Sequence, residues 1–244
     1  MCHDDDSRPP SPPVVGEVVS HALITLTGSD GNSFAAYQAV PATPNGRNVV
    51  ILPDVRGLHP YYEQLAIRFA EAGFHAVALD YFGRTQGVAQ RGDDFDWQSE
   101  IGTLTPDGVA ADAAASAAHI GSLHSGPTFT LGFCFGGSHS WRLSASDLDL
   151  AGVMGFYGRP SMIADVEEAF SKPLMLLAGG NDGATPVPEF TALDARLTER
   201  GLDHELYVYD GAPHSFFDRA FAEWKPACDD AWSRILAFTD RLSS

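Results

Sequence analysis

The chain has 244 residues, of which 44% are hydrophobic and 19% are charged, and this composition is typical of a folded globular protein rather than a disordered one. Its 15 basic and 32 acidic residues give a formal net charge of −17, which argues against nucleic acid and anionic membranes as partners. No apolar run reaches the roughly 18 residues that cross a bilayer, and the acidic start is not a secretory signal. We therefore expect a cytoplasmic protein, whose three scattered cysteines stay reduced.

The first third of the chain predicts an arm, a hairpin and then a strand–helix unit. Residues 1–16 hold an Asp run and a proline-rich stretch, which predicts a disordered arm. Apolar segments at 18–26 and 34–40 flank the turn signal Gly-Ser-Asp-Gly-Asn and predict a β-hairpin. A strand at 49–52 and a helical pattern from Tyr62 to Ala70, closed by Gly73, follow.

The remainder alternates strands with helices. Strands are predicted at 75–79, 128–131, 151–156, 173–178 and 205–209, and helices at 106–124, 138–144, 188–200 and around 232–239. Buried apolar strands that alternate with helices predict an α/β fold with a mostly parallel sheet and helices on both faces. No linker or repeat divides residues 17–244, so a single domain is expected, with an irregular stretch at 80–105 as its longest insertion.

The most informative motif is Gly-Phe-Cys-Phe-Gly-Gly at residues 132–137. It lies between a predicted strand and a predicted helix, where a sharp turn exposes the middle side chain at the carboxyl edge of the sheet. Cys134 stands where such a nucleophile elbow usually has serine, and the start of the helix favours a thiolate there. Taken alone, the motif fits a glycine-rich turn around a buried cysteine equally well.

A nucleophile on the third parallel strand indicates an α/β-hydrolase arrangement, which requires an acid and then a histidine after later strands. Asp182 follows the strand at 173–178, and His214 follows the strand at 205–209. An aspartate in an Asn-Asp-Gly turn or a histidine that caps a helix would explain each residue singly. The order and the strand ends together favour a catalytic triad in which His214 is the base and Asp182 orients it.

The loop after the first parallel strand supplies the other expected site groups. The backbone N–H groups of Val55 and Phe135 are the predicted oxyanion donors. Asp54 then lies beside the nucleophile, although an aspartate at a strand end is also a common helix cap.

These motifs resemble the dienelactone hydrolase family, the cysteine-dependent branch of the α/β-hydrolases. The resemblance covers the chain beyond the arm, and it is carried by the elbow, by Leu-Asp-Tyr-Phe-Gly-Arg at 79–84, by Asn-Asp at 181–182 and by His-Ser-Phe at 214–216. It implies hydrolysis of a lactone or activated ester without a cofactor. It also implies that Asp54, where the family usually has glutamate, holds the Cys134 thiol protonated until substrate arrives.

The resemblance implies two arginines that grip a substrate carboxylate. The first corresponds to Arg84. The second is expected at position 218, where this chain has Asp218, and Arg219 is one place further on. Arg219 could still turn towards the substrate, and Arg56 and Arg159 lie near candidate site loops. All three are nevertheless interpreted as solvated surface charges.

The leading hypothesis is a hydrolase that cleaves a dienelactone-like, carboxylate-bearing lactone or a small activated ester through Cys134, Asp182 and His214. Alternatives are a thioesterase or another small-ester hydrolase of the same fold, and a non-catalytic binding protein on a hydrolase scaffold. No metal site is expected, because the histidines are scattered without a Cys/His cluster. The expected partner is a small molecule, and the sequence leaves open whether the protein is a monomer or a homodimer.

Overall fold

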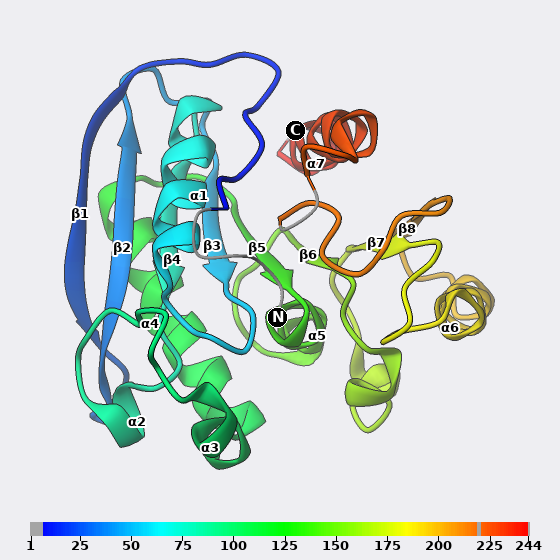
Figure 1. Ribbon diagram of the computed structural model, residues 1–244, viewed down its shortest axis with the longest axis horizontal. Helices are drawn as coiled ribbons and strands as arrows, with labels where there is room; N and C mark the ends of the chain where they lie inside the picture. The colour runs from blue at the N-terminus through cyan, green and yellow to red at the C-terminus, as the bar shows by residue number, and fades with distance from the viewer. Residues whose placement is uncertain (1–6, 219–220, 244) are drawn as a thin grey trace.

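The computed structural model describes residues 7–218 and 221–243, which are organised around an eight-stranded sheet (Figure 1). The strand order is β1-β2-β4-β3-β5-β6-β7-β8; β1, β2 and β4 pair antiparallel, and all further neighbours are parallel. The strands are β1 (Val18–Thr27), β2 (Ser33–Pro41), β3 (Asn48–Leu52), β4 (His75–Leu79), β5 (Thr128–Phe133), β6 (Gly152–Phe156), β7 (Leu174–Gly179) and β8 (His204–Tyr209). The predicted hairpin and the mostly parallel sheet of an α/β-hydrolase are confirmed.

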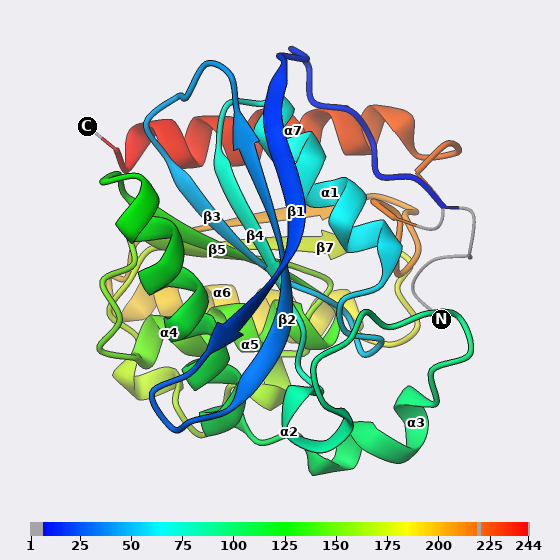
Figure 2. The ribbon, with the colours of Figure 1, turned by 90° about the vertical axis from the view of Figure 1, so that its left-hand side faces the viewer.

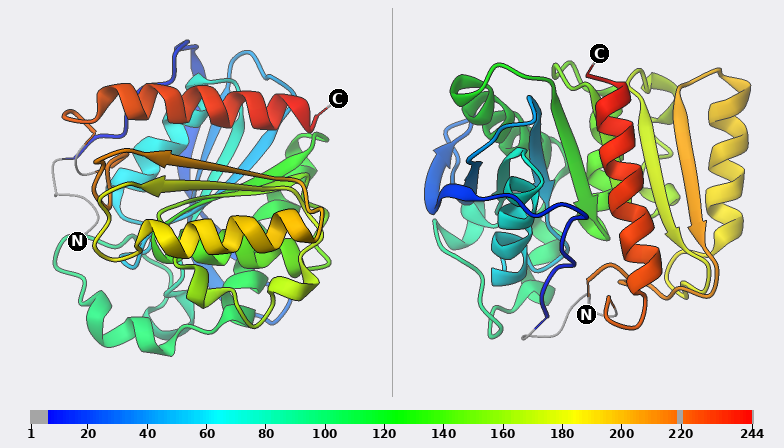
Figure 3. Two further views of the ribbon diagram at one scale, coloured as in Figure 1. Left: turned by 90° about the vertical axis from the view of Figure 1, so that its right-hand side faces the viewer. Right: turned by 90° about the horizontal axis from the view of Figure 1, so that it is seen from above.

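Helices cover both faces of this sheet (Figures 2 and 3). On one face, α1 (Pro60–Glu71) and α7 (Lys225–Arg241) contribute side chains to one hydrophobic cluster. On the other, α4 (Pro106–Leu123), α5 (Phe135–Arg142) and α6 (Val187–Glu199) contribute to a second. Every residue of β3 to β7 is buried, which explains why these strands are continuous apolar runs rather than alternating ones.

The stretch at 80–105 is not wholly irregular. It holds two one-turn helices, α2 (Gly83–Gln86) and α3 (Trp97–Glu100), followed by the 3₁₀ turn η1 (Ile101–Thr103). Arg91 fixes this stretch to the sheet, because its Nη2 lies 2.8 Å from Asp80 Oδ2 and its guanidinium lies 5.0 Å from the centre of the Phe95 ring. Further 3₁₀ turns are η2 (Leu143–Ala145), η3 (Pro160–Met162) and η4 (Glu167–Ala169).

The described part of the proline-rich arm lies against the domain. The indole N–H of Trp232 donates to the carbonyl of Pro10 at 3.1 Å, and the N–H of Gly16 donates to the carbonyl of Glu71 at 2.8 Å. This placement differs from the expectation of a disordered arm over residues 1–16, of which 1–6 lie outside the described residues. A proline-rich segment needs no sheet or helix to become ordered when a distant side chain, such as that of Trp232, donates a hydrogen bond to one of its carbonyls.

Within residues 7–218 and 221–243, no helix is long and apolar enough to span a bilayer. The cytoplasmic location stays a prediction.

Candidate active site

Cys134 occupies a strained turn between β5 and α5, with φ 53° and ψ −112°. A Cβ at Gly132 would lie 1.9 Å from the carbonyl oxygen of Gly136, and one at Gly136 would lie 2.2 Å from the carbonyl oxygens of Leu52 and Pro53. Only glycine fits such contacts. Because Gly136 and Gly137 are packed closely as the first turn of the helix, α5 begins at Phe135, three residues before the predicted start at residue 138.

His214 and Asp182 form a hydrogen-bonded pair beyond the ends of β8 and β7. The Nδ1 atom of His214 lies 2.7 Å from Asp182 Oδ2, while Asp182 Oδ1 accepts the N–H groups of Ala184 at 2.7 Å and Thr185 at 3.2 Å. Burial acts to raise the pKa of Asp182, but the hydrogen bonds from His214 and the two backbone groups outweigh it and hold this pKa below its usual value. An ionised Asp182 keeps a proton on Nδ1 and leaves Nε2 able to accept one.

A cavity of about 400 Å³ brings the candidate groups together. Cys134, His214 and the residues of both predicted oxyanion donors share its wall. Phe135 is the first residue of α5, so its N–H has no partner inside the helix. Two further lining residues come from the stretch at 80–105, which therefore contributes to the wall of the site. The lining residues are Val55, Trp97, Ile101, Cys134, Phe135, Arg159, Met162 and His214.

Asp54 is fully buried and directly precedes Val55 of the cavity wall. Its backbone N–H donates to the hydroxyl of Tyr62 at 3.0 Å, and its Oδ1 accepts the backbone N–H of Arg56 at 2.8 Å. The Nε atom of Arg56 lies 3.9 Å from Asp54 Oδ2, and the Arg56 side chain is itself buried. Arg56, which was interpreted as a surface charge, is therefore buried beside Asp54, the carboxylate that is the candidate for controlling the thiol.

The arginines predicted to hold a substrate carboxylate are differently placed. Arg84 is absent from the cavity wall; it pairs with Asp30 and, at 2.8 Å, with Asp112. Arg219 lies outside the described residues. Asp218, at the position of the expected second arginine, is buried and accepts the hydroxyl of Tyr157 at 2.7 Å.

Tyr157 and Met162 belong to no motif that marked them in the sequence, and Arg159 was interpreted as a surface charge. All three directly follow β6, at the same sheet edge as the elbow, and that position is the signal that could have identified them. The Tyr157 ring lies 4.7 Å from the ring of His214. Arg159 is exposed to solvent yet lines the cavity.

Backbone strain is concentrated around the cavity. In the described ranges, the non-glycine residues with positive φ are Cys134 at 53°, Tyr157 at 37° and Ser215 at 63°. One is the candidate nucleophile and one directly follows His214, while the third packs against that histidine. Such conformations cost about 1–3 kcal/mol each and cluster at functional sites.

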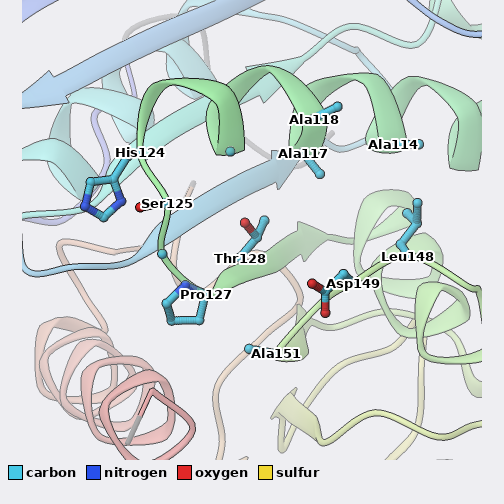
Figure 4. Close-up of a pocket in the computed structure, with 12 residues that line it drawn as sticks. Ala114, Ala117, Ala118, His124, Ser125, Pro127, Thr128, Leu148, Asp149 and Ala151 are labelled. Carbon is cyan, nitrogen blue, oxygen red and sulfur yellow. The ribbon is translucent and has the colours of Figure 1, made fainter.

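A larger cavity, of about 660 Å³, lies at the opposite edge of the sheet. Figure 4 shows it between α4 and the amino ends of β5 and β6, with Thr128 and Ala151 on one side and Ala114, Ala117 and Ala118 on the other. Its wall carries His124 and Asp149 but none of the groups gathered around Cys134. The volume of a cavity therefore does not identify the candidate active site of this protein. The smaller cavity is identified by the catalytic candidates Cys134 and His214, which line the same wall.

The chain is similar to several curated proteins. It is 26% identical over 235 residues to "Putative carboxymethylenebutenolidase" of Yersinia pestis, with 88% of this chain and 86% of the relative covered. It is also 26% identical to "Probable 2-oxo-3-(5-oxofuran-2-ylidene)propanoate lactonase" of a Bradyrhizobium species, with 86% and 90% covered.

Solved structures share the fold. "Putative Dienelactone Hydrolase" from Klebsiella pneumoniae superposes with a TM-score of 0.75 at 24% identity, covering 90% of this chain and 99% of that one. The model of the dienelactone hydrolase family matches residues 34–243. With that match and this fold, the chain belongs to the dienelactone hydrolase family of hydrolases.

Proposed function

We propose that this protein hydrolyses a lactone or a small activated ester, with Cys134 as nucleophile and His214 as general base. The observation that carries the proposal is the shared cavity: Cys134, His214, Val55 and Phe135 line one space of about 400 Å³. The names of the curated relatives, a carboxymethylenebutenolidase and a lactonase, support the same bond type.

The proposed reaction proceeds in two halves. His214 takes the thiol proton through Nε2 while Cys134 Sγ attacks the carbonyl carbon, and the N–H groups of Val55 and Phe135 bind the resulting oxyanion. Collapse of this intermediate breaks the C–O bond, and His214 returns the proton to the leaving oxygen. His214 then deprotonates a water molecule that attacks the thioester, which releases the carboxylic acid and restores the thiol. Asp182 stays ionised throughout and stabilises the imidazolium.

The test compares wild type with Cys134→Ala on p-nitrophenyl acetate and on the lactone dihydrocoumarin. We expect Cys134→Ala and His214→Ala each to lower kcat/KM by at least about a thousandfold. Cys2→Ser, which removes a thiol remote from the elbow in sequence, is the matched control and should retain activity. If wild type cleaves neither compound faster than Cys134→Ala, the protein is not a cysteine hydrolase and the non-catalytic binding hypothesis gains support.

We further propose that Asp54 keeps the resting thiol protonated. Iodoacetamide should then alkylate Cys134 slowly near neutral pH, and faster in Asp54→Ala, as followed by mass spectrometry of the peptide that contains Cys134. Cys228 is an internal control: burial first, and the nearby Asp218 second, raise the pKa of its thiol to about 12. Labelling of Cys228 therefore reports an unfolded variant, whereas fast labelling of wild-type Cys134 contradicts the gating role.

A further inference from the structure

The wall of the reactive cavity is apolar apart from its catalytic groups and one cation. Val55, Trp97, Ile101 and Met162 supply hydrophobic surface. Among the described lining residues, Arg159 is the one with a permanent positive charge, and its guanidinium forms no ion pair with a described carboxylate. An unpaired guanidinium at the mouth of an apolar pocket is suited to bind a planar anion such as a carboxylate.

Arg84 is chemically unsuited to this task in the observed arrangement. Its two guanidinium nitrogens already bind Asp30 and Asp112, and a third contact runs from Nη2 to the carbonyl of Gly108 at 3.1 Å. The two aspartates neutralise its charge and add one negative charge to the surroundings. A substrate anion at Arg84 would have to displace either Asp30 or the almost fully buried Asp112, and it would still face the remaining carboxylate.

The backbone fixes Arg159 relative to the nucleophile. The N–H of Arg159 donates to Ser138 Oγ at 2.8 Å, and the N–H of Ser138 donates to the carbonyl of Cys134 at 3.2 Å. Pro160 follows at the start of η3 and restricts the backbone there. Two hydrogen bonds thus connect the candidate anchor to the candidate nucleophile, so the separation of the two sites is set by the fold.

Arg159 and Arg84 lie on opposite sides of Cys134. The nucleophile follows β5, Arg159 follows β6, and Arg84 follows β4, two strands away across β3. Figure 1 shows α2, which carries Arg84, and the yellow-green segment after β6 on either side of α5. A substrate held at Arg159 therefore extends towards the β6 side of the nucleophile, the side on which β7 and β8 position Asp182 and His214.

We infer that Arg159, and not Arg84, is the carboxylate anchor of this enzyme, and that the substrate carries its carboxylate on the β6 side of the scissile bond. The inference rests on the proposed function of the Cys134 site. The charge of the whole chain, −17, repels anions, so an anionic substrate is retained only where a local cation outweighs that field. Arg159 contributes binding in the ground state and transition state alike, and it therefore acts mainly on KM.

The experiment uses p-nitrophenyl monoesters of the dicarboxylic acids from glutarate to suberate, each paired with its neutral methyl ester. The series varies the distance between the reacting carbonyl and the free carboxylate. For the best carboxylate substrate, Arg159→Gln should raise KM about tenfold or more, with less than about a twofold change for its neutral partner. Arg159→Lys should restore part of the preference, and added salt should reduce it in the wild type.

Arg234→Gln is the matched control, because it removes one guanidinium from the surface of α7, where Arg234 pairs with Asp230 at 3.3 Å. This control should leave both KM values unchanged and so excludes an effect of net charge. Equal effects of Arg159→Gln on the charged and neutral esters, or a selective effect of Arg84→Gln instead, would overturn the assignment. Neutral esters keep this outcome separate from a failure of the proposed function, which would abolish Cys134-dependent turnover of both partners.

Discussion

We predict that the free energy of unfolding falls in acid because the imidazole of His139 is buried in the folded protein. His139 lies on α5 one turn after Phe135, is 4% exposed, and its ring centre is 4.3 Å from that of Phe135. Burial, with a smaller contribution from the charge of Arg142, lowers the pKa of His139 from 6.5 to about 4. The folded protein therefore keeps this imidazole neutral over a pH range in which the unfolded chain protonates it.

The size of the effect follows from the two pKa values. Because folding lowers the pKa, the stabilisation is complete above pH 6.5 and is lost as the pH falls towards 4. At pH 4.5 the unfolded chain is almost fully protonated at His139, whereas about a quarter of the folded molecules are. Integration from pH 7.5 to pH 4.5 gives a loss of about 2.5 kcal/mol in the free energy of unfolding from this one group.

The assay is urea denaturation of wild type and His139→Phe at half-unit steps over that pH range. His139→Phe keeps an aromatic ring against Phe135 but has no proton to bind, and His139→Gln serves if the phenyl ring is too large for the site. The difference in unfolding free energy, wild type minus variant, should decrease by about 2.5 kcal/mol as the pH falls. A difference that stays constant, or that grows in acid, would refute the assignment of a buried neutral imidazole.

Two further changes test the buried carboxylates Asp112 and Asp218. Burial raises the pKa of Asp112 to about 6, so the folded protein becomes less stable as the pH rises through this range. Between pH 4 and pH 7, the free energy of unfolding of wild type should fall by about 2 kcal/mol relative to that of Asp112→Asn in urea titrations. This pH dependence is opposite in sign to that of His139. Tyr157→Phe removes the hydroxyl that donates to Asp218 at 2.7 Å, so the urea midpoint should drop by the equivalent of about 1–3 kcal/mol in unfolding free energy. The value of kcat/KM should change only severalfold, because the ring still packs on His214. A loss of kcat/KM as large as that of His214→Ala would contradict this supporting role.

The ordered candidate triad could be predicted from the sequence because each member directly follows an apolar run. A buried parallel strand is a local pattern, and the carboxyl ends of parallel strands meet at one edge. Cys134, Asp182 and His214 therefore required no knowledge of long-range contacts. The exact start of α5 was missed because glycines at 136 and 137 suggest a loop, whereas their close packing against neighbouring strands makes them the first helical turn.

The electrostatic partners could not be predicted in the same way. Arg84 binds Asp30, 54 residues earlier, and Asp112, 28 residues later, and neither spacing leaves a periodic signal. A motif can therefore identify an arginine without revealing that its charge is already neutralised. The hydrogen bond from Trp232 to Pro10 could not be predicted either, because it spans 222 residues. It holds the arm against the domain, whereas the composition of the arm predicts disorder.

Packed aromatic side chains of the core connect the strained residues of the candidate site to the hydrogen bond between Trp232 and Pro10. Holding Cys134, Tyr157 and Ser215 at positive φ costs on the order of several kcal/mol together, and such strain persists only where the surroundings fix the backbone. The Phe217 ring supplies part of that constraint, because it packs 5.9 Å and 4.5 Å from the aromatic rings that end β5 and β6 and 6.0 Å from Trp232. Since the indole of Trp232 also donates to the carbonyl of Pro10, the arm is attached to the same aromatic cluster that packs behind the nucleophile turn.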